Sequence, residues 1–475
     1  MHPPAPSACP ELRRTGNSIL DRRQLLQVGG LGMLGLTLPK LLGGTARAAE
    51  GGEKRALPVK AKSVVFLYQF GGPSHLDTFD MKPDAPQGIR GPLKSIQTNV
   101  PGLAICEHLP RMASMMDKVT LVRSMHHEMK NHNSASYYAL TGVAPPVDDI
   151  RLKDTLELFP AYGSIVDRLG RGPAGVPTFV SYPYVIRDGS ITPGQRASFL
   201  GKGHDPLLVT EDPNAANFRL PELSLPANLS LERLEDRREI QKLIDKQSRL
   251  LEHSTAARGV DAYYDTAMSM LSSTRTREAF NLEAEPKEMR EKYGRTTYGQ
   301  SCLLARRLVE AGVRFVNVYF SDTIGGQSTT SGGWDTHGFN NTRMFPIVEK
   351  FHFPLTNQVL PTFLEDLDSR GLLDETLVVW MGEFGRTPKI NDNQSRDHWP
   401  QCYTALLAGG GVKRGHIHGA SDKNGAYPAR DMVRPDDLAA TMFHLLGLDL
   451  STEVHDINNR PLPISAGKPV LGVLA

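Results

Sequence analysis

The sequence has few cysteines, no long apolar run and no marked excess of charge of either sign. Four cysteines among 475 residues exclude a small fold held together by disulfide bonds. No uninterrupted apolar stretch reaches the roughly 18 residues that span a bilayer, so we expect no stable membrane span. The 54 basic side chains are balanced by 52 acidic ones, which argues against a nucleic-acid partner, because nucleic-acid-binding proteins carry a basic excess.

Several catalytic signatures are absent as well. No predicted strand is followed by the Gly-x-Gly-x-x-Gly motif of dinucleotide-binding proteins, and the phosphate-binding Gly-x-x-x-x-Gly-Lys-Ser/Thr motif does not occur. The Gly-x-Ser-x-Gly turn that carries the nucleophile of α/β-hydrolases is also missing. Apolar residues make up 40% of the chain, which at this length is ample for a large core. The remaining class is a globular protein of the size of an enzyme.

Residues 1–48 have the features of an export signal rather than of a fold. Arg22 and Arg23 precede a weakly apolar, glycine-rich run over 28–42, and residues 46–48 form an Ala-x-Ala cleavage site. The arginine pair predicts a twin-arginine signal peptide, hence the twin-arginine export machinery as a partner and a periplasmic or secreted location. A Sec signal is the nearest alternative, although its apolar segment is usually more apolar than this one.

Cleavage after Ala48 would leave 475 − 48 = 427 residues and three cysteines, Cys106, Cys302 and Cys402. Three cysteines allow at most one disulfide and leave at least one free thiol. None of them belongs to a Cys-x-x-Cys motif, so a metal site built from thiolates is not supported.

The rest of the chain alternates apolar runs with amphipathic segments. This rhythm predicts an α/β fold with a mostly parallel central sheet covered by helices on both faces, in one domain over 49–475. A charged segment near 229–288 predicts a helical insertion on one side of the sheet. The predicted strands are 63–68, 119–122, 176–185, 313–320, 376–381 and 403–408, and the predicted helices are 111–117, 133–141, 353–370 and 437–446.

Histidines and carboxylates lie in the loops next to five of these strands. Ligands of open α/β sheets bind outside the carboxyl ends of strands, so we expect these loops to share one site. Imidazole and carboxylate without thiolate suit zinc, manganese, iron, calcium or magnesium, as one ion or as a pair. The residues are His75, Asp77 and Asp80 after the first strand, His126, His127 and His132 after the second, Asp335 and His337 after 313–320, Glu383 and Arg386 after 376–381, and Asp397 and His398 before 403–408.

Several of these stretches resemble one known family. Residues 360–385 are similar to the sulfatase segment in which a helix, a turn and a strand lead to metal ligands, and residues 134–142 resemble the helix that carries the sulfatase nucleophile. Together with 71–80, 334–338 and 382–388, these motifs resemble the bacterial exported family called domain of unknown function 1501, which is abundant in planctomycetes. That family is placed within the alkaline phosphatase/sulfatase superfamily, so the resemblance implies an alkaline phosphatase-like core.

The resemblance also implies roles for individual residues. The implied metal ligands are Asp77, Asp335, His337, Glu383 and His398, with Asp397 beside the last. Two positions depart from the superfamily pattern. Phe384 stands where the superfamily has a histidine ligand, and counting back from Gly142 places His132, instead of a hydroxyl residue, at the nucleophile position. Ser134 lies two residues later. His132 could therefore serve as a further ligand, with water activated by the metal as the attacking group.

Two functions follow as expectations. The first is a metal-dependent hydrolase of sulfate or phosphate esters, on a small molecule or a polysaccharide, with zinc, manganese, calcium or magnesium as cofactor. His132 and Ser134 are then candidate catalytic residues, and Arg386 or Lys130 would stabilise the developing negative charge. The alternative is an exported protein that binds a ligand or a surface partner without turnover, which the missing hydroxyl and Phe384 favour. The retained ligand set opposes it, because charged side chains are costly to bury without a metal.

Overall fold

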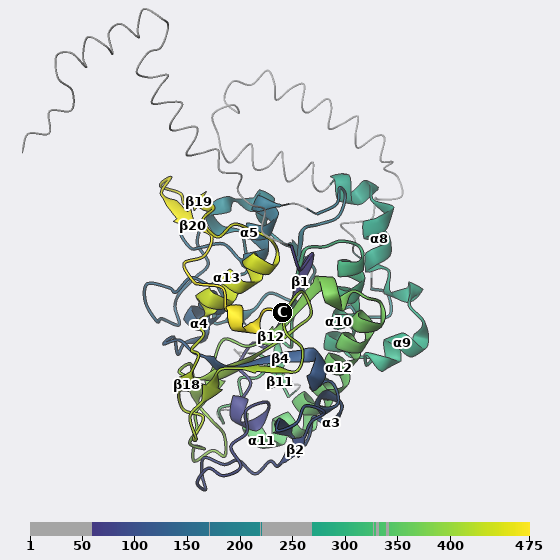
Figure 1. Ribbon diagram of the computed structural model, residues 1–475. Helices are drawn as coiled ribbons and strands as arrows, with labels where there is room; N and C mark the ends of the chain where they lie inside the picture. Colours follow the sequence, from purple (N-terminus) through teal and green to yellow (C-terminus); the bar gives the residue numbers. More distant parts are fainter. Residues whose placement is uncertain are drawn as a thin grey trace, which may run out of the picture. The chain divides into compact units, whose positions relative to one another are not determined.

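The apolar run at 63–68 forms an inner strand of an eight-stranded sheet at the centre of the protein (Figure 1). The computed structural model describes residues 59–170, 172–218, 220, 268–325, 327–328, 332–338 and 342–475. The order across the sheet is β16-β4-β15-β12-β1-β9-β5-β8. Its strands are β1 (Ser63–Tyr68), β4 (Val119–Met125), β5 (Phe179–Tyr182), β8 (Leu207–Leu208), β9 (Phe315–Tyr319), β12 (Thr376–Met381), β15 (Tyr403–Ala408) and β16 (His416–His418).

The direction of β15 decides which loops meet. β15 is antiparallel to both of its neighbours, β12 and β4, whereas all other neighbouring pairs in the sheet are parallel. The start of β15 therefore lies at the same edge as the carboxyl ends of β1, β4, β9 and β12. The predicted α/β class with a mostly parallel sheet is confirmed, and the single reversed strand brings a loop that precedes a strand to the edge where the others end.

Both faces of the sheet are buried. Val65 and Leu67 of β1 belong to one apolar cluster together with side chains of α10 and α12, while Val64 and Phe66 belong to a second cluster that contains side chains of α4, α5 and α13. Each fully buried side chain of this kind contributes about 1.5–3 kcal/mol to folding. The helices are α3 (Pro110–Ala113), α4 (His132–Thr141), α5 (Tyr162–Leu169), α8 (Thr274–Phe280), α9 (Lys287–Lys292), α10 (Thr297–Glu310), α11 (Met344–Ile347), α12 (Phe353–Ser369) and α13 (Pro435–Leu445).

Short two-stranded ribbons accompany the central sheet, and one of them carries residues of the site. β13 (Gly385–Arg386) pairs antiparallel with β14 (His398–Trp399), which joins the loop after β12 to the loop before β15. The other ribbons are β2 (Ser95–Gln97) with β3 (Ala104–Cys106), β6 (Arg187–Asp188) with β7 (Ser190–Ile191), β10 (Thr323–Ile324) with β11 (Gln327–Ser328), β17 (Ala420–Ser421) with β18 (Pro428–Arg430), and β19 (Glu453–His455) with β20 (Pro461–Pro463).

Two predicted regions lie wholly or mainly outside the described residues. The export signal over 1–48 is one, and the other is the insertion over 229–288, of which the described part from 268 onward contains α8 and the start of α9. The described residues form part of one compact unit, Leu57–Ala475. No helix among them is long and apolar enough to cross a membrane.

The three cysteines of the described chain are free thiols. Cys106, Cys302 and Cys402 are all buried, and no disulfide joins them. Burial raises the pKa of each thiol, because a thiolate would lose its hydration. These cysteines are consequently apolar core residues with little reactivity.

Candidate metal centre

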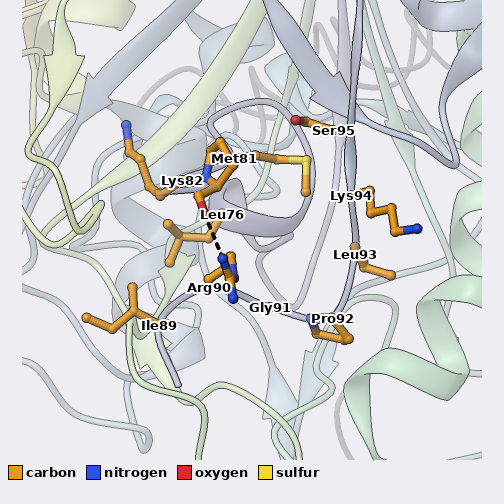
Figure 2. A pocket seen from close by; sticks show the side chains of 11 residues that line it. Leu76, Met81, Lys82, Ile89, Arg90, Gly91, Pro92, Leu93, Lys94 and Ser95 are labelled. Carbon is orange, nitrogen blue, oxygen red and sulfur yellow. Dashed lines mark hydrogen bonds between the residues drawn. The ribbon is translucent and has the colours of Figure 1, made fainter. Parts of the chain in front are cut away.

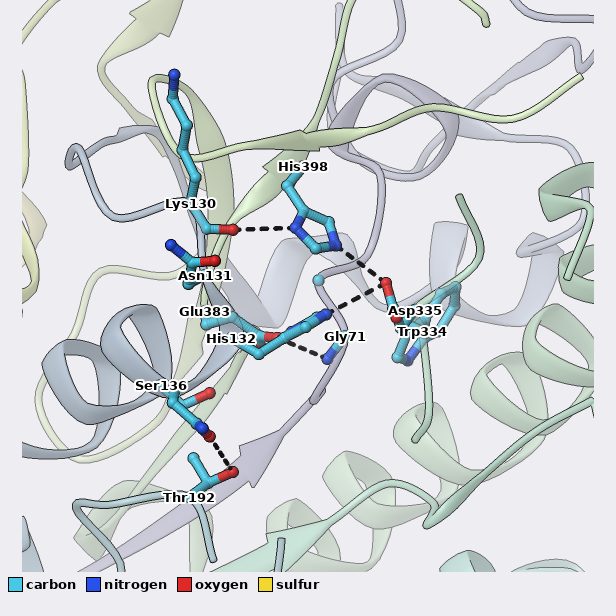
Figure 3. A network of polar contacts seen from close by, with 12 residues as sticks. Gly71, Lys130, Asn131, His132, Ser136, Thr192, Trp334, Asp335, Glu383 and His398 are labelled. Atoms are coloured by element: carbon cyan, nitrogen blue, oxygen red, sulfur yellow. Dashed lines mark hydrogen bonds and ion pairs between the residues drawn. The ribbon is translucent and has the colours of Figure 1, made fainter. Parts of the chain in front are cut away.

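Three side chains from distant parts of the chain converge at the edge of the sheet (Figure 3). His132 is the first residue of α4, Asp335 lies in the loop after β9, and His398 begins β14. Oδ1 of Asp335 lies 3.3 Å from Nε2 of His132 and 3.0 Å from Nε2 of His398. The three ligand atoms all lie within 4.8 Å of one another. They form the only such group of three or more metal-binding side chains within the described ranges.

A glycine allows the Asp335 loop to come this close to β1. Gly71 follows the strand with a positive φ of 98°, and a Cβ atom added there would overlap the backbone of Trp334 and Asp335. The conformation and the lack of space both require glycine. The backbone N–H of Gly71 donates a hydrogen bond to Oε1 of Glu383 at 2.8 Å.

Glu383 fixes the orientation of the His132 ring. Its Oε1 lies 2.7 Å from Nδ1 of His132, and its Oε2 accepts a hydrogen bond from the Tyr68 hydroxyl at 3.2 Å. The carboxylate is fully buried and is held by three partners, the third being Gly71. With Nδ1–H donated to Glu383, Nε2 of His132 is left to face Asp335. This is the arrangement in which a carboxylate sets the tautomer of a metal-binding histidine.

His398 is oriented in a similar way by a backbone carbonyl. Its Nδ1 lies 3.0 Å from the carbonyl oxygen of Lys130, which leaves Nε2 for Asp335. The ring stacks on Phe384, with centroids 4.3 Å apart and planes 29° apart. Figure 3 shows the ammonium end of Lys130 pointing away from the cluster, so its carbonyl, and not its charge, contacts the site.

The charges of the cluster depend strongly on one another. Burial and the charge of His132 lower the pKa of His398 to about 3. Burial would also lower the pKa of His132, but the carboxylates of Asp335 and Glu383 outweigh it and raise this pKa to about 10. Against the effect of burial, the three histidines hold the pKa of Asp335 well below its usual range. A cation at this position would replace the proton on Nε2 of His132 and release it.

The residues fit a divalent metal ion. Tetrahedral ligands at about 2.0 Å from an ion lie roughly 3.3 Å from one another, close to the 3.3 and 3.0 Å that separate Oδ1 of Asp335 from the two histidine nitrogens. Nε2 of His132 is buried and forms an ion pair with Oδ1 of Asp335 at 3.3 Å but no well-aligned hydrogen bond, a geometry that leaves both atoms available to a shared ligand. Two imidazoles and one carboxylate form a set that leaves coordination positions open, as catalytic metal sites do.

Two further predicted residues contact Asp335. Nε2 of His337 lies 3.2 Å from the other carboxylate oxygen, Oδ2, and the His337 side chain is 21% exposed. Arg386 is fully buried and donates to Oδ1 of Asp335 at 3.2 Å. Its remaining N–H groups donate to backbone carbonyls, those of Gly72 and Trp334 among them. Arg386 is therefore a positioning residue for the Asp335 loop, and none of its nitrogens remains without a protein partner.

The structure places the other predicted site residues outside the cluster. Asp77 forms a buried ion pair with Arg396, whose Nε lies 2.7 Å from Oδ2. Asp397 is exposed and accepts a hydrogen bond from Asn391 at 3.0 Å. The Ser134 hydroxyl donates to the carbonyl of Asp149 and accepts from its backbone N–H, so it fastens a loop. Glu383 belongs behind His132 instead of among the three converging ligand atoms.

Sequence reasoning did not identify several residues that complete the site. Tyr68, at the end of β1, binds Glu383, and Phe70 packs against His132 with ring centroids 5.1 Å apart. The ring centroid of Phe384 also lies 5.1 Å from that of His132, so two apolar rings pack against the His132 imidazole. The aromatic residues shortly before the glycine pair at 71–72 are the sequence signal from which Tyr68 and Phe70 could have been identified as site residues. Arg396, the partner of Asp77, has no comparable signal.

The comparisons with known proteins agree with the resemblance seen in the sequence. The profile of the family described as "Protein of unknown function (DUF1501)" matches residues 61–474, so the chain belongs to this family. No curated protein shows significant sequence similarity to the chain.

Solved structures share a distant similarity with the chain. The PsFucS1 sulfatase from Pseudoalteromonas sp. is 10% identical, with a TM-score of 0.40 over 88% of this chain and 73% of that one. A protein in the alkaline phosphatase superfamily from Vibrio parahaemolyticus is 12% identical, with a TM-score of 0.39 over 89% and 75%. The phosphonate monoester hydrolase SpPMH from Silicibacter pomeroyi is 10% identical, with a TM-score of 0.37 over 88% and 76%.

Proposed function

We propose that the protein is a metal-dependent hydrolase of sulfate or phosphate esters. The observation that carries the proposal is the pair of histidines whose outer nitrogens are each held by an acceptor, so that both inner nitrogens face Asp335. Metal-binding histidines almost always donate their other ring N–H to a carboxylate or a carbonyl in this way, which supports a metal at this position. Zinc and manganese suit the mixed imidazole and carboxylate set best.

His132, Asp335 and His398 would hold the ion, which when bound supplies Lewis-acid activation of the ester. Glu383 keeps the proton of His132 on Nδ1, and Arg386 keeps the Asp335 carboxylate in place. His337 is more exposed than His132, and its Nε2 lies 3.2 Å from Oδ2 of Asp335, at the edge of the cluster. Because the Ser134 hydroxyl is bound to a loop, we assign the attack to water and not to a side-chain hydroxyl.

A second function, binding of a ligand without turnover, is favoured by one observation. Phe384 fills the position at which the superfamily carries a histidine, and its apolar ring contacts both His132 and His398. An apolar ring there removes a ligand for a second ion. A site with one ion and no hydroxyl nucleophile would still bind an oxyanion. The binding protein and the hydrolase therefore differ only in whether the bound ester is turned over.

One experiment separates the two candidates. The purified protein is analysed for bound metal by mass spectrometry and assayed with a panel of sulfate and phosphate monoesters and diesters, beside a His398→Ala variant. An Asp397→Asn variant is the matched control, since this exposed carboxylate adjoins His398 without joining the cluster. Metal with turnover that is lost only in His398→Ala supports the hydrolase. Metal without turnover supports the binding protein, and the absence of both overturns the proposed function.

We further propose that the protein is exported by the twin-arginine route to the periplasm or beyond. The support is the order of an arginine pair, a weakly apolar run and an Ala-x-Ala site within 1–48. Replacing Arg22 and Arg23 together by lysine should retain the precursor in the cytoplasm of a bacterial host. Normal export of the double variant, measured by cell fractionation, would exclude this route.

A further inference from the structure

A cavity of about 520 Å³ opens beside the loop that follows β1 (Figure 2). Leu76 of the short 3-10 helix η1 (His75–Asp77) forms one wall, and residues 81–83 and 89–95 form the others. The lining combines apolar side chains such as Met81 and Leu93 with three cations, Lys82, Arg90 and Lys94. No carboxylate is among the residues that line it.

Within the described residues, two of the three cations have no anionic partner. Lys82 is paired with Asp80, with Nζ 2.9 Å from Oδ1. The Arg90 guanidinium makes a single hydrogen bond in the described part of the chain, to the carbonyl of Pro83 at 3.3 Å, and this contact is drawn in Figure 2. Lys94 forms no ion pair with any described residue, although its backbone N–H donates to Glu107. Charge is therefore available to a ligand at this cavity.

The wall of the cavity is connected to the metal centre by buried contacts. Arg396 donates to the carbonyl of Ile89 at 2.8 Å and pairs with Asp77 at 2.7 Å. The carbonyl of Arg396 accepts a hydrogen bond from Arg386, which in turn holds Asp335.

Gly91 packs tightly against Asp77 in this wall: a Cβ atom at position 91 would lie only 2.5 Å from Oδ1 of Asp77. Arg396 also stands two residues before His398 in the chain. The wall thus has a fixed position relative to the cluster.

We propose that this cavity is a subsite for a second anionic group of the same substrate, a sulfate, phosphate or carboxylate that is not the group being cleaved. The guanidinium fork of Arg90 matches the oxygens of such groups, while Lys94, whose ammonium end points away from Arg90 in Figure 2, adds positive charge at the rim of the cavity. The volume lies within the range of small-molecule sites and exceeds that of one oxyanion, so the cavity has room for the monomer unit that bears the anion. The inference rests on the proposed function and narrows its substrate class to polyanionic oligomers.

Binding measurements test the subsite independently of turnover. Calorimetry would compare a tetrasaccharide bearing one sulfate per unit, its desulfated counterpart and inorganic sulfate, on the full chain. The variants are Arg90→Ala/Lys94→Ala and, as a matched control, Arg275→Ala/Lys287→Ala, two exposed cations on α8 and α9. An Asp335→Asn variant removes one ligand of the metal centre and replaces none of the residues that line the cavity.

We expect the sulfated tetrasaccharide to bind at least tenfold more tightly than the desulfated one, and the Arg90→Ala/Lys94→Ala variant to lose this difference while the control keeps it. Asp335→Asn should retain the preference for the sulfated form. Equal binding of the two tetrasaccharides, or an unchanged double variant, would overturn the subsite. Inorganic sulfate that binds as tightly as the tetrasaccharide would also overturn it, because the cavity would then be a site for free anions. If the parent protein held no metal and showed no turnover but still bound the sulfated tetrasaccharide more tightly than the desulfated one, that result would count against the proposed function and not against the subsite.

Discussion

The carboxylate of Glu383 lies 2.7 Å from Nδ1 of His132, while the carboxylate of Asp335 lies 3.3 Å from Nε2 of the same ring. The imidazole is thus held between two carboxylates. Under the proposed function, Glu383 sets the proton on Nδ1 and Asp335 shares the ion with Nε2. Glu383, two residues after the end of β12, would in this way support a ligand and would not itself be one. The distinction leads to measurable differences between carboxylates that the sequence alone treats alike.

The first prediction concerns Glu383. Replacing it by glutamine removes the charge that orients His132, so metal affinity should fall about 10–100-fold, the usual effect of losing such a partner. Asp335→Asn should lower the affinity much further, since it removes a ligand. Affinities are measured by competition with a chelating dye. Asp397→Asn serves as control, and a larger loss in this variant than in Glu383→Gln would contradict the assignment.

The second prediction concerns Asp77, which the family resemblance implies as a ligand and which the structure pairs with Arg396. Asp77→Asn leaves the buried Arg396 without its partner, so the free energy of unfolding should fall by about 3–5 kcal/mol. The metal content of the folded protein should stay the same. Asp374→Asn breaks an exposed pair with Arg414 and should cost less than about 1 kcal/mol. Urea unfolding and metal analysis check both outcomes, and loss of metal from folded Asp77→Asn would restore Asp77 as a ligand.

The third prediction concerns Phe384, whose ring supports His398. Phe384→Ala leaves a cavity in a buried position and should lower the free energy of unfolding by about 3–5 kcal/mol. Metal affinity should fall with it, because His398 loses the ring on which it stacks. Phe351→Ala, at a position that is 39% exposed, is the control and should have a clearly smaller effect. Unfolding is followed in urea on metal-free protein, and equal losses in the two variants would contradict the expected role.

The fourth prediction concerns the dependence of stability on pH. His352 packs against Trp334 and Phe320, and burial lowers its pKa from 6.5 to about 3. Between these two values the unfolded chain binds a proton that the native chain does not, so stability falls as the pH falls from 6.5 toward 3. This histidine contributes about 1 kcal/mol per pH unit over most of that range.

A His352→Phe variant keeps the aromatic packing and removes the titrating group. Its stability, measured by urea unfolding between pH 5 and 6 on metal-free protein, should depend less steeply on pH than that of the parent. Above pH 7 the two curves should run parallel, because the histidine is neutral there in both states. Equal slopes between pH 5 and 6 would show that His352 does not resist protonation.

Much of the fold could be predicted from the sequence because buried parallel strands are continuous apolar runs. The bounds of β1, β12 and β15 coincide with the predicted ones, and β4, β5 and β9 lie within a few residues of theirs. What the sequence could not reveal is the reversed direction of β15. Strand direction follows from how the chain crosses the sheet and leaves no mark on the apolar pattern.

The candidate site was predictable in position and only partly in detail. The loops that end or begin at the sheet edge were expected to converge, and those of His132, Asp335 and His398 do so in the structure. The partner of each carboxylate was not predictable. Asp77 meets Arg396 across 319 positions of sequence, and a buried aspartate beside a strand has the same appearance in the sequence whether it binds a metal or an arginine.

The sequence separation within the metal centre also has a consequence for how the protein matures. His132 and Glu383 are 251 positions apart, and Asp335 and His398 are 63 apart, so the cluster cannot exist until most of the chain has been synthesised and the sheet has closed. An incomplete or half-folded chain would hold no ion there. Metal retention would therefore report on native chains only. On the proposed export route, a cell that loads the ion in the cytoplasm would have to fold the whole protein before transporting it.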